Sequence, residues 1–265
     1  MLTELLIDPR KASAGLVKFI ADETGKAGFK KAVLGLSGGM DSAVVAFLAK
    51  EAMGKENVFG IIMPYQGSSR QDIKDAERAA KTAGINSRLI SIEPMLESFI
   101  KTLPEMDRIR KGNVMARLRM IILYDQSKPL KALVLGTSNK TEMLLGYGTI
   151  YGDMACGLAP LGGLYKTQVR QLAKYLDLPE TIISKPPSAG LWPGQTDEEE
   201  LGLRYDEVDA LLYYMIDRRY EDNQLIKNGF SPEMLSKVRE KIKSSEFKRR
   251  MPKVEDKTIV QLKGE

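Results

Sequence analysis

The feature that most constrains the fold is an apolar segment that passes through a glycine-rich turn directly into a helical pattern. Residues 31–36 predict a buried strand, Ser37-Gly38-Gly39 predicts the turn, and a helix begins near Met40. Two adjacent glycines let backbone N–H groups converge, because no Cβ atom obstructs them. The helix N-terminus behind them adds free N–H groups and a positive dipole. The segment therefore predicts a phosphate-binding loop between a strand and a helix.

An acidic residue follows the turn. Asp41 lies in the first turn of the predicted helix, where a carboxylate could hold a Mg²⁺ ion bound to the phosphate. No Gly-Lys-Ser/Thr follows the glycines, so the segment is not the common P-loop. The alternative is an ordinary glycine-rich turn, but strand, loop, acid and helix occur here in the order that phosphate binding requires.

Strands alternate with helices along much of the chain. This pattern predicts an α/β fold with an open, mostly parallel sheet of the five-stranded type, helices on both faces and a helical C-terminal part. No repeat, low-complexity tract or linker divides residues 1–265, so we expect one domain. The carboxyl ends of the strands should bring the loops at Ser37, Tyr65 and Thr137 to one site. The predicted strands are residues 31–36, 57–63, 87–92 and 130–136, and the predicted helices are 3–24, 40–53, 70–83, 94–102, 106–127, 166–176, 204–218 and 232–244.

Two residue types are scarce enough to limit the chemistry. Histidine is absent and Cys156 is the only cysteine, which excludes Ser-His-Asp and Cys-His nucleophiles, a Cys-only zinc site and an intrachain disulfide. Carboxylates, Lys, Arg, backbone N–H groups and Mg²⁺ are left to do any catalysis.

The charge balance suits an anionic partner. The net charge is +5 and the sequence pI is near 9.0, which fits a nucleotide or an RNA. The basic run at Lys248 could fold back on an anionic ligand or could be a plain basic tail. No apolar run approaches the roughly 20 residues of a membrane helix. The N-terminus carries acids and lacks a basic lead, so we expect no signal peptide and a cytoplasmic location.

Several segments outside the first loop carry side chains suited to a nucleotide. Thr137 follows a predicted strand and could bind a ribose or phosphate, and Glu142 could give the metal a second carboxylate. Arg117 could grip a phosphate or carboxylate, although a surface helix with salt bridges explains it as well. Lys166 opens a helix and could reach a phosphate. Residues 187–198 form a long irregular segment, which is typical of a binding loop or of disorder.

Taken together, these motifs resemble the ammonia-dependent NAD⁺ synthetases of the PP-loop ATP pyrophosphatase superfamily. The resemblance covers about residues 30–253. The first loop alone indicates only the superfamily, whereas the Leu-Tyr-Lys-Thr and Gln-Thr-Asp-Glu segments are more specific. The motifs are Ser-Gly-Gly-Met-Asp-Ser (37–42), Asn113 to Arg119, Gly-Thr-Ser-Asn-Lys-Thr-Glu (136–142), Tyr-Gly-Asp (151–153), Leu-Tyr-Lys-Thr-Gln-Val (164–169), Pro187 to Glu198 and Lys-Arg-Arg (248–250).

The resemblance implies a reaction in which deamido-NAD⁺, ATP and ammonia give NAD⁺, AMP and pyrophosphate, with Mg²⁺. The nicotinate carboxylate forms an acyl adenylate, which ammonia then attacks. Asp41 and Lys166 would be catalytic, and Asp41 and Glu142 would hold Mg²⁺. Family members are homodimers, and a nucleic-acid partner is not expected. The residues implied in ATP binding are Gly35, Leu36, Ser37, Gly38, Gly39, Met40, Asp41, Ser42, Thr137, Lys166 and Ser188.

The acceptor side departs from the family pattern. Arg117, Asp153 and Lys248 are the residues implied in binding deamido-NAD⁺. Many family members have Lys, Asp and His where this chain has, in order, Ile150, Gly157 and Phe247. We expect the neighbouring charged groups to compensate, and Gly157→Asp to tighten deamido-NAD⁺ binding; a different acceptor carboxylate is the alternative.

Two other functions stay open from the sequence. One is another PP-loop adenylating enzyme, such as a tRNA-modifying one, although sulfur-inserting members use paired cysteines. The other is a nucleotide-binding module without catalysis, which the two acids Asp41 and Glu142 argue against.

Overall fold

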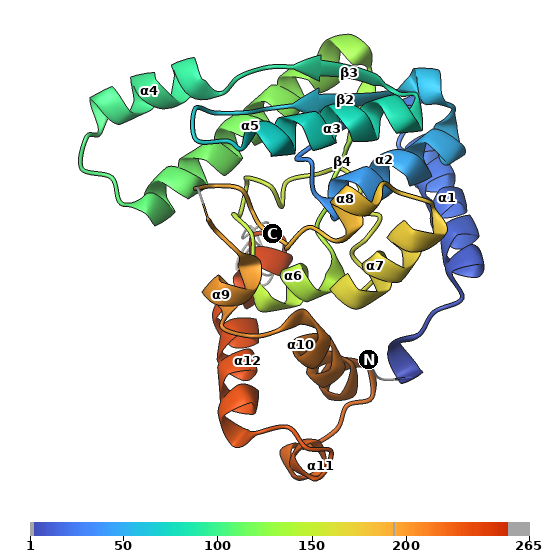
Figure 1. Cartoon of the computed structure of the whole chain (residues 1–265), viewed down its shortest axis with the longest axis vertical. Coiled ribbons are helices and arrows are strands. Elements are labelled where there is room, and N and C mark those ends of the chain that lie inside the picture. The colour runs from blue at the N-terminus through green and yellow to red at the C-terminus, as the bar shows by residue number, and fades with distance from the viewer. Residues whose placement is uncertain (1–2, 193, 254–265) are drawn as a thin grey trace, which may run out of the picture.

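The sheet is built from short parallel strands. A computed structural model describes residues 3–192 and 194–253. Within them an isolated parallel bridge joins Leu135 to Leu158 beyond the last strand. The predicted open parallel sheet is confirmed, with four strands in the described residues and one bridge in place of a fifth (Figure 1). In the order β3-β2-β1-β4 the strands are β3 (Asn86–Leu89), β2 (Val58–Ile62), β1 (Lys31–Gly35) and β4 (Ala132–Leu135).

The strand order creates a switch point beside β1. The chain runs from β1 through β2 to β3 at one edge, and then returns to place β4 on the other side of β1. Val33 pairs with Phe59 on β2 and with Val134 on β4, so all three strands end at nearly the same level. Ligands of open α/β sheets bind where the order reverses, outside the carboxyl ends of the strands. The loops after β1 and β4 therefore define the place to look for a site.

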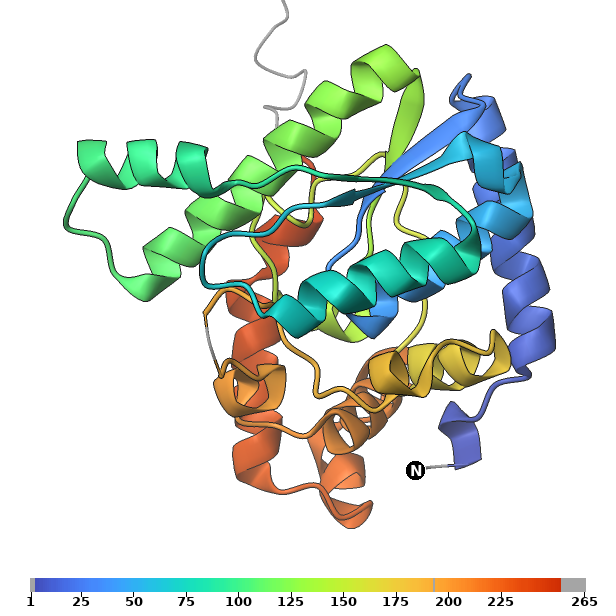
Figure 2. The same ribbon diagram turned by 45° about the horizontal axis from the view of Figure 1, so that its top comes forward.

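Helices cover both faces of the sheet, as the alternating pattern predicted (Figures 1 and 2). Because successive side chains of a strand point to opposite faces, Ala32 and Leu34 pack in one apolar cluster and Val33 packs in another. The first face is covered by α1 (Pro9–Lys26), α2 (Met40–Met53), α3 (Arg70–Ala83), α7 (Lys166–Tyr175) and α8 (Glu180–Ile183). The second is covered by α4 (Glu93–Thr102) and α5 (Arg108–Leu130).

The C-terminal part is helical and has an apolar cluster of its own. Tyr165, Leu201, Tyr205 and Leu211 are buried in this third cluster. The C-terminal helices lie below the sheet in Figure 1. The predicted helical C-terminal part is confirmed. Its helices are α6 (Lys140–Leu145), α9 (Asp197–Leu201), α10 (Tyr205–Leu212), α11 (Asp222–Lys227) and α12 (Pro232–Ser244), with a π-helical turn at Tyr213–Asp217 and a 3₁₀ turn at Glu246–Arg249.

Two predicted helices differ from the structure. The helix expected at residues 3–24 is a 3₁₀ turn, Thr3–Leu5, followed by α1 from Pro9. Proline disfavours helical backbone at the residue before it, and the Asp8 side chain caps the new start by accepting from the N–H of Arg10 at 3.1 Å. The helix expected at 204–218 changes to a π-helical turn after Leu212.

Helices α6, α8, α9 and α11 were not predicted, because each is only 4 to 6 residues long. The described part of the chain contains no helix with the length and apolar character needed to cross a membrane.

Candidate active site

The loop after β1, residues Ser37–Ser42, is called the PP-loop from here on. Gly38 has φ +79°, and a Cβ atom there would lie 2.2 Å from the carbonyl oxygen of Asp72, so only glycine fits. The Ser42 hydroxyl accepts from the N–H of Ser37 at 3.3 Å and donates to the carbonyl of Gly39 at 3.0 Å. These bonds hold the loop in shape. Gly39 is the N-cap of α2 and has no side chain, so the first N–H groups of α2 are left for a ligand.

A cluster of two acids and one lysine lies beside the PP-loop. The ammonium of Lys166 forms an ion pair with Asp41, and its Nζ is 3.4 Å from Oε1 of Glu142. The amide of Asn139 donates to Oδ1 of Asp41 at 3.2 Å. The side chain of Lys166 is only 4% exposed, so the charge lies at the bottom of the site. The structure thus brings together side chains from α2, α6 and α7, and the three charged ones were all predicted from sequence.

The start of α6 fixes the Glu142 carboxylate. The N–H of Glu142 donates to Oδ1 of Asn139 at 3.0 Å, and the N–H of Asn139 donates to Oε2 of Glu142 at 3.2 Å. This reciprocal pair is a capping box, which holds the N-terminus of a helix. Glu142 therefore uses one oxygen for the cap and presents the other to Lys166. Asn139 likewise joins the cap to Asp41, a role that the sequence did not predict.

The start of α7 fixes Lys166. Thr141 accepts from the N–H of Lys166 at 3.0 Å and donates to Oδ1 of Asp209 at 2.5 Å, while Oδ2 of Asp209 accepts from the N–H of Thr167 at 2.8 Å. Asp209 is fully buried on α10. Sequence reasoning missed both Thr141 and Asp209. A signal was available, because Asp209 is the one charged residue within the apolar run from Val208 to Leu212.

The electrostatics of the cluster are strongly coupled. Burial raises the pKa of Glu142 to about 8; Lys166 works against this shift, and Asp41 adds to it. Burial lowers the pKa of Lys166, but Asp41 and Glu142 raise it by more, and the net pKa lies above its ordinary value. Lys166 is therefore a fixed positive charge. Glu142 can gain or lose a proton near neutral pH, and an added cation would favour its charged form.

The two carboxylates fit a Mg²⁺ ion that also binds phosphate. Mg²⁺ takes one or two protein carboxylates and completes its shell with water and phosphate oxygens. Asp41 and Glu142 could supply two carboxylates; the described residues hold no group of three or more acids, Cys or His arranged for a metal. Both have side chains that are 14–17% exposed.

The segment after α8 leads to Asp197, which interacts electrostatically with Lys166. Asp197 accepts from the hydroxyls of Tyr147 at 2.9 Å and Tyr205 at 3.1 Å. The ring of Tyr205 lies 5.4 Å from the Lys166 ammonium, so it packs as a second layer behind the lysine.

Ser188 was predicted to contact ATP, and its hydroxyl accepts from the N–H of Gly190 at 3.1 Å. Thr137 lies half-buried just after β4. The predicted irregular segment is thus partly ordered by α9; Pro193, within it, lies outside the described residues.

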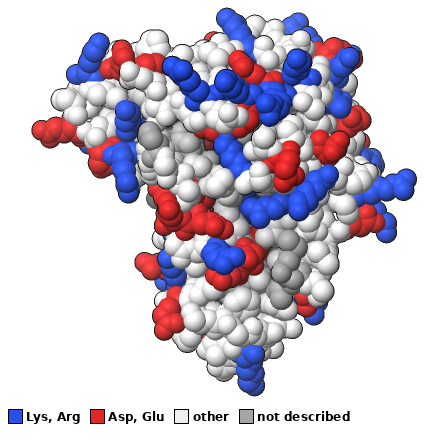
Figure 3. Space-filling view, viewed as in Figure 1, with Lys and Arg blue, Asp and Glu red and all other residues white. Residues whose placement is uncertain are grey.

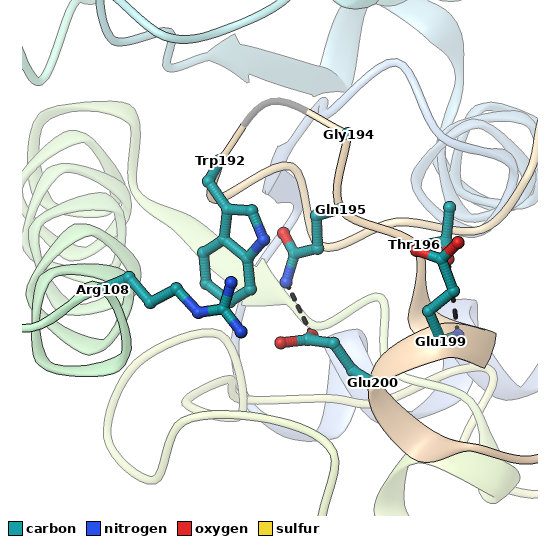
Figure 4. Close-up of a pocket in the computed structure, with 7 residues that line it drawn as sticks. All are labelled: Arg108, Trp192, Gly194, Gln195, Thr196, Glu199 and Glu200. Carbon is teal, nitrogen blue, oxygen red and sulfur yellow. Dashed lines mark hydrogen bonds between the residues drawn. The ribbon is translucent and has the colours of Figure 1, made fainter.

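Two pockets flank the Trp192 side chain. One has a volume of about 290 Å³ and is lined by Arg108, Trp192 and the residues around Gln195 (Figure 4). There the amide of Gln195 donates to Glu200 at 2.7 Å, and the Arg108 guanidinium lies 5.2 Å from the indole ring. The other, of about 460 Å³, lies toward Tyr65. Neither pocket is lined by the PP-loop, so neither is the phosphate site itself.

The three residues predicted to bind deamido-NAD⁺ all contact the loop at residues 146–153. Arg117 donates to the carbonyl of Ile150 at 3.3 Å, and Asp153 accepts from the N–H of Thr149 at 2.8 Å. The Lys248 ammonium donates to the carbonyls of Gly146 and Gly148, both at 2.8 Å. These charges are therefore grouped, but Lys248 is engaged with backbone at the C-terminal end of α6. Phe247 is exposed.

Gly157 is closely packed. A Cβ atom there would lie 2.4 Å from Cδ1 and 3.0 Å from Cγ of Leu133. Leu133 packs against the main apolar cluster, so it has little room to withdraw. This argues against the sequence-based expectation that Gly157→Asp simply adds a ligand contact: Leu133 occupies the space that the new side chain would need.

The doubly wound sheet, the PP-loop and the acid–lysine cluster at its switch point define a nucleotide-binding α/β protein. Comparison with known proteins is more specific. A sequence model of the NAD synthase family matches residues 13–252. The NH(3)-dependent NAD(+) synthetase of Trichlorobacter lovleyi is 49% identical over 261 residues, which are 97% of this chain and 96% of that protein. The chain belongs to the NAD synthase family, and the resemblance seen in its sequence is confirmed.

Solved structures agree. The NMN synthetase of Francisella tularensis matches with a TM-score of 0.85 and 36% identity over 95% of this chain and 100% of that one. The NH3-dependent NAD synthetase of Campylobacter jejuni, solved with a nitrate ion, matches with a TM-score of 0.81, again at 36% identity, over 95% of this chain and 100% of that one.

Proposed function

We propose that this protein is an ammonia-dependent NAD⁺ synthetase that activates a nicotinate carboxylate with ATP. The observation that carries the proposal is the Asp41–Lys166–Glu142 cluster beside the PP-loop, in a chain that matches an NH(3)-dependent relative over nearly its full length. The N-terminus of α2 and the Lys166 ammonium supply positive charge where a triphosphate would bind. No nucleophilic side chain is needed, which agrees with the absence of histidine.

The proposed reaction has two steps. A carboxylate oxygen of the nicotinate ring attacks the α-phosphorus of ATP, the bond from that phosphorus to the bridging oxygen breaks, and pyrophosphate leaves. Ammonia then attacks the acyl carbon of the adenylate, loses a proton, and AMP leaves with the electrons of the broken C–O bond. Asp41 and Glu142 would hold Mg²⁺, which would neutralise phosphate charge when bound.

The residues of the cluster would act by charge and position. Lys166 would offset the negative charge that moves onto the leaving pyrophosphate, and its buried setting strengthens that effect because water does not screen it. Asn139 would hold the Asp41 carboxylate in place through the 3.2 Å bond. Thr137 and Ser188 remain predicted ATP contacts.

The nitrogen donor and the acceptor are tested together. Purified protein is incubated with ATP, Mg²⁺ and deamido-NAD⁺, with ammonium or with glutamine, and NAD⁺, AMP and pyrophosphate are quantified. We expect equal amounts of the three products with ammonium and little with glutamine. ATP binding without turnover for any carboxylate would favour a binding module, and AMP formation that depends on tRNA would favour an RNA-modifying enzyme.

The RNA alternative gains little support from the face of the molecule in Figure 3. On the face in Figure 3, basic and acidic side chains are interspersed and do not form one continuous basic band. A nucleotide in a local site fits this distribution better than a long RNA, which requires an extended basic footprint.

One observation makes nicotinate mononucleotide a second candidate acceptor. The Francisella tularensis protein, with its TM-score of 0.85, is an NMN synthetase, so a close fold can amidate a mononucleotide. The acceptor side of this chain also differs from the common pattern at Ile150 and Phe247. Measuring kcat/KM for deamido-NAD⁺ and for nicotinate mononucleotide in the same assay decides between them. We expect the dinucleotide to be preferred.

The predicted homodimer is part of the same proposal. In Figures 1 and 2, α4 and the adjoining end of α5 extend away from the sheet. On α5, Ile121 and Tyr124 are three residues apart and are 53% and 43% exposed, which places apolar surface on one face of the helix. Light scattering on purified protein would test the dimer. The cytoplasmic location and the single domain stay predictions from the sequence.

A further inference from the structure

A lysine outside the predicted set connects three parts of the molecule. Lys185 lies just after α8, and its ammonium forms an ion pair with Asp72, lies 3.2 Å from Oδ2 of Asp75, and donates to the carbonyl of Gly38 at 3.4 Å. Asp72 and Asp75 belong to α3, and Gly38 belongs to the PP-loop. One side chain therefore joins α3, the PP-loop and the segment that continues to Ser188.

The acids that Lys185 contacts need a cation. Asp75 is 1% exposed, and its other carboxylate oxygen accepts from the amide of Gln71 at 2.8 Å. A buried carboxylate is costly unless it is paired and hydrogen-bonded. Lys185 supplies that charge and is itself only a quarter exposed. The two acids on α3 therefore determine the position of the Lys185 ammonium.

The backbone of α3 at Asp72 also positions the PP-loop backbone. The Cα of Gly38 approaches α3 so closely that a Cβ atom would lie 2.2 Å from the carbonyl oxygen of Asp72. Gly38 therefore has packing contact on one side and the Lys185 ammonium on its carbonyl. Because the peptide group that follows Gly38 carries both this carbonyl and the N–H of Gly39, fixing the carbonyl also fixes the direction of that N–H. The N–H of Gly39 donates to the Ser37 hydroxyl at 3.2 Å, so its direction determines the shape of the PP-loop.

We propose that Lys185 is a positioning residue for ATP: it holds Gly38 against α3, and so sets the direction of the PP-loop N–H groups. It also keeps Ser188 at a fixed distance from the PP-loop, since only two residues separate Ser188 from Lys185. The proposal rests on the proposed function in so far as ATP is the ligand of the PP-loop. It assigns Lys185 no contact with the reacting atoms.

The first test is the Lys185→Met variant, measured by calorimetric titration with ATP alone and by steady-state kinetics. The substitution removes charge-assisted hydrogen bonds that hold the PP-loop, so we expect ATP affinity to fall roughly tenfold. The KM for ATP should rise by a similar factor. KM for the acceptor should stay unchanged, which a general loss of structure would not allow. Lys185→Arg keeps the charge and should restore most of the affinity. Lys18→Met, which removes an exposed ion pair with Asp22 on α1, is the matched control.

The second test asks whether Lys185 acts through α3. Asp75→Asn should also weaken ATP binding, and the double variant should lose less than the sum of the two, because both changes break one junction. Additive losses, or an Asp75→Asn variant that binds ATP more tightly, would overturn the proposal by pointing to direct contact between Lys185 and phosphate.

If wild-type protein binds no ATP, the proposed function fails. If it binds ATP and Lys185→Met binds it equally well, only this inference fails.

Discussion

The two sides of the site are built differently. On the ATP side, Lys166 contacts both Asp41 and Glu142, and each of the three comes from the start of a different helix. On the acceptor side, Arg117 and Lys248 donate to backbone carbonyls of one loop, residues 146–153. The first arrangement is buried and fixed by helix caps, whereas the second depends on the conformation of a loop. Substitutions on the ATP side should therefore reduce activity more than substitutions on the acceptor side.

The largest effect should come from Asp41→Asn. The substitution removes one of two charges available to Mg²⁺ and one partner of Lys166, so we expect kcat to fall by about 10³-fold with the fold retained. Circular dichroism checks the fold, and NAD⁺ formation checks activity. Asp22→Asn makes the same chemical change in an exposed ion pair on α1 and should have no effect. Full activity in Asp41→Asn would disprove the metal assignment.

Asp209→Asn should have the next largest effect, and on stability first. The Asp209 carboxylate accepts from the Thr141 hydroxyl and from the Thr167 N–H, whereas an amide offers only one acceptor. We expect the free energy of unfolding to fall by about 1–3 kcal/mol in urea titrations. Asp206→Asn, on the exposed face of the same helix, is the matched control. An unchanged midpoint in Asp209→Asn would mean that the start of α7 does not depend on this cap.

Gly157→Asp should show how the acceptor side differs. The new Cβ would collide with Leu133, so we expect a loss of about 1–3 kcal/mol in stability and no gain in deamido-NAD⁺ affinity. Combining it with Leu133→Ala makes space for the side chain. If the single variant binds deamido-NAD⁺ more tightly and is as stable as wild type, the packing argument is wrong and the sequence-based expectation holds.

The last effect concerns pH. Glu142 has a pKa of about 8 in the folded protein against an ordinary 4.5, so the folded state binds a proton that the unfolded state has released. Between these values the stability of the nucleotide-free protein should fall as pH rises. Glu142→Gln cannot titrate and should flatten the slope of melting temperature against pH from about 5 to 8. Glu23→Gln, in an exposed pair on α1, should leave it unchanged; equal slopes in wild type and Glu142→Gln would contradict the buried titration.

The structure brings together Asp41, Glu142 and Lys166, three of the residues predicted for the ATP side, and there is a physical reason for this. Local rules place Asp41 and Lys166 in the first turns of helices, and the parallel sheet brings those turns to one edge. Asp209 and Lys185 could not be placed in the same way. Their partners lie 42 to 147 residues away in the chain, so their contacts depend on how helices pack and not on local pattern.

The acceptor side shows the same limit. Arg117, Asp153 and Lys248 came from resemblance, and their common contact with residues 146–153 is visible only in three dimensions. Gly157 was read as a missing ligand, because a sequence does not show that Leu133 fills the space beside it.

The central claim is that the Lys166 cluster directs cleavage of ATP at the α-phosphorus toward a nicotinate carboxylate. Phosphorus NMR of the products made by wild type and by Lys166→Met tests it most directly. We predict AMP and pyrophosphate in amounts equal to NAD⁺ over many turnovers, which require both acceptor and ammonium, and almost none from the variant. ADP and inorganic phosphate as products, or an equally active Lys166→Met variant, would contradict the account.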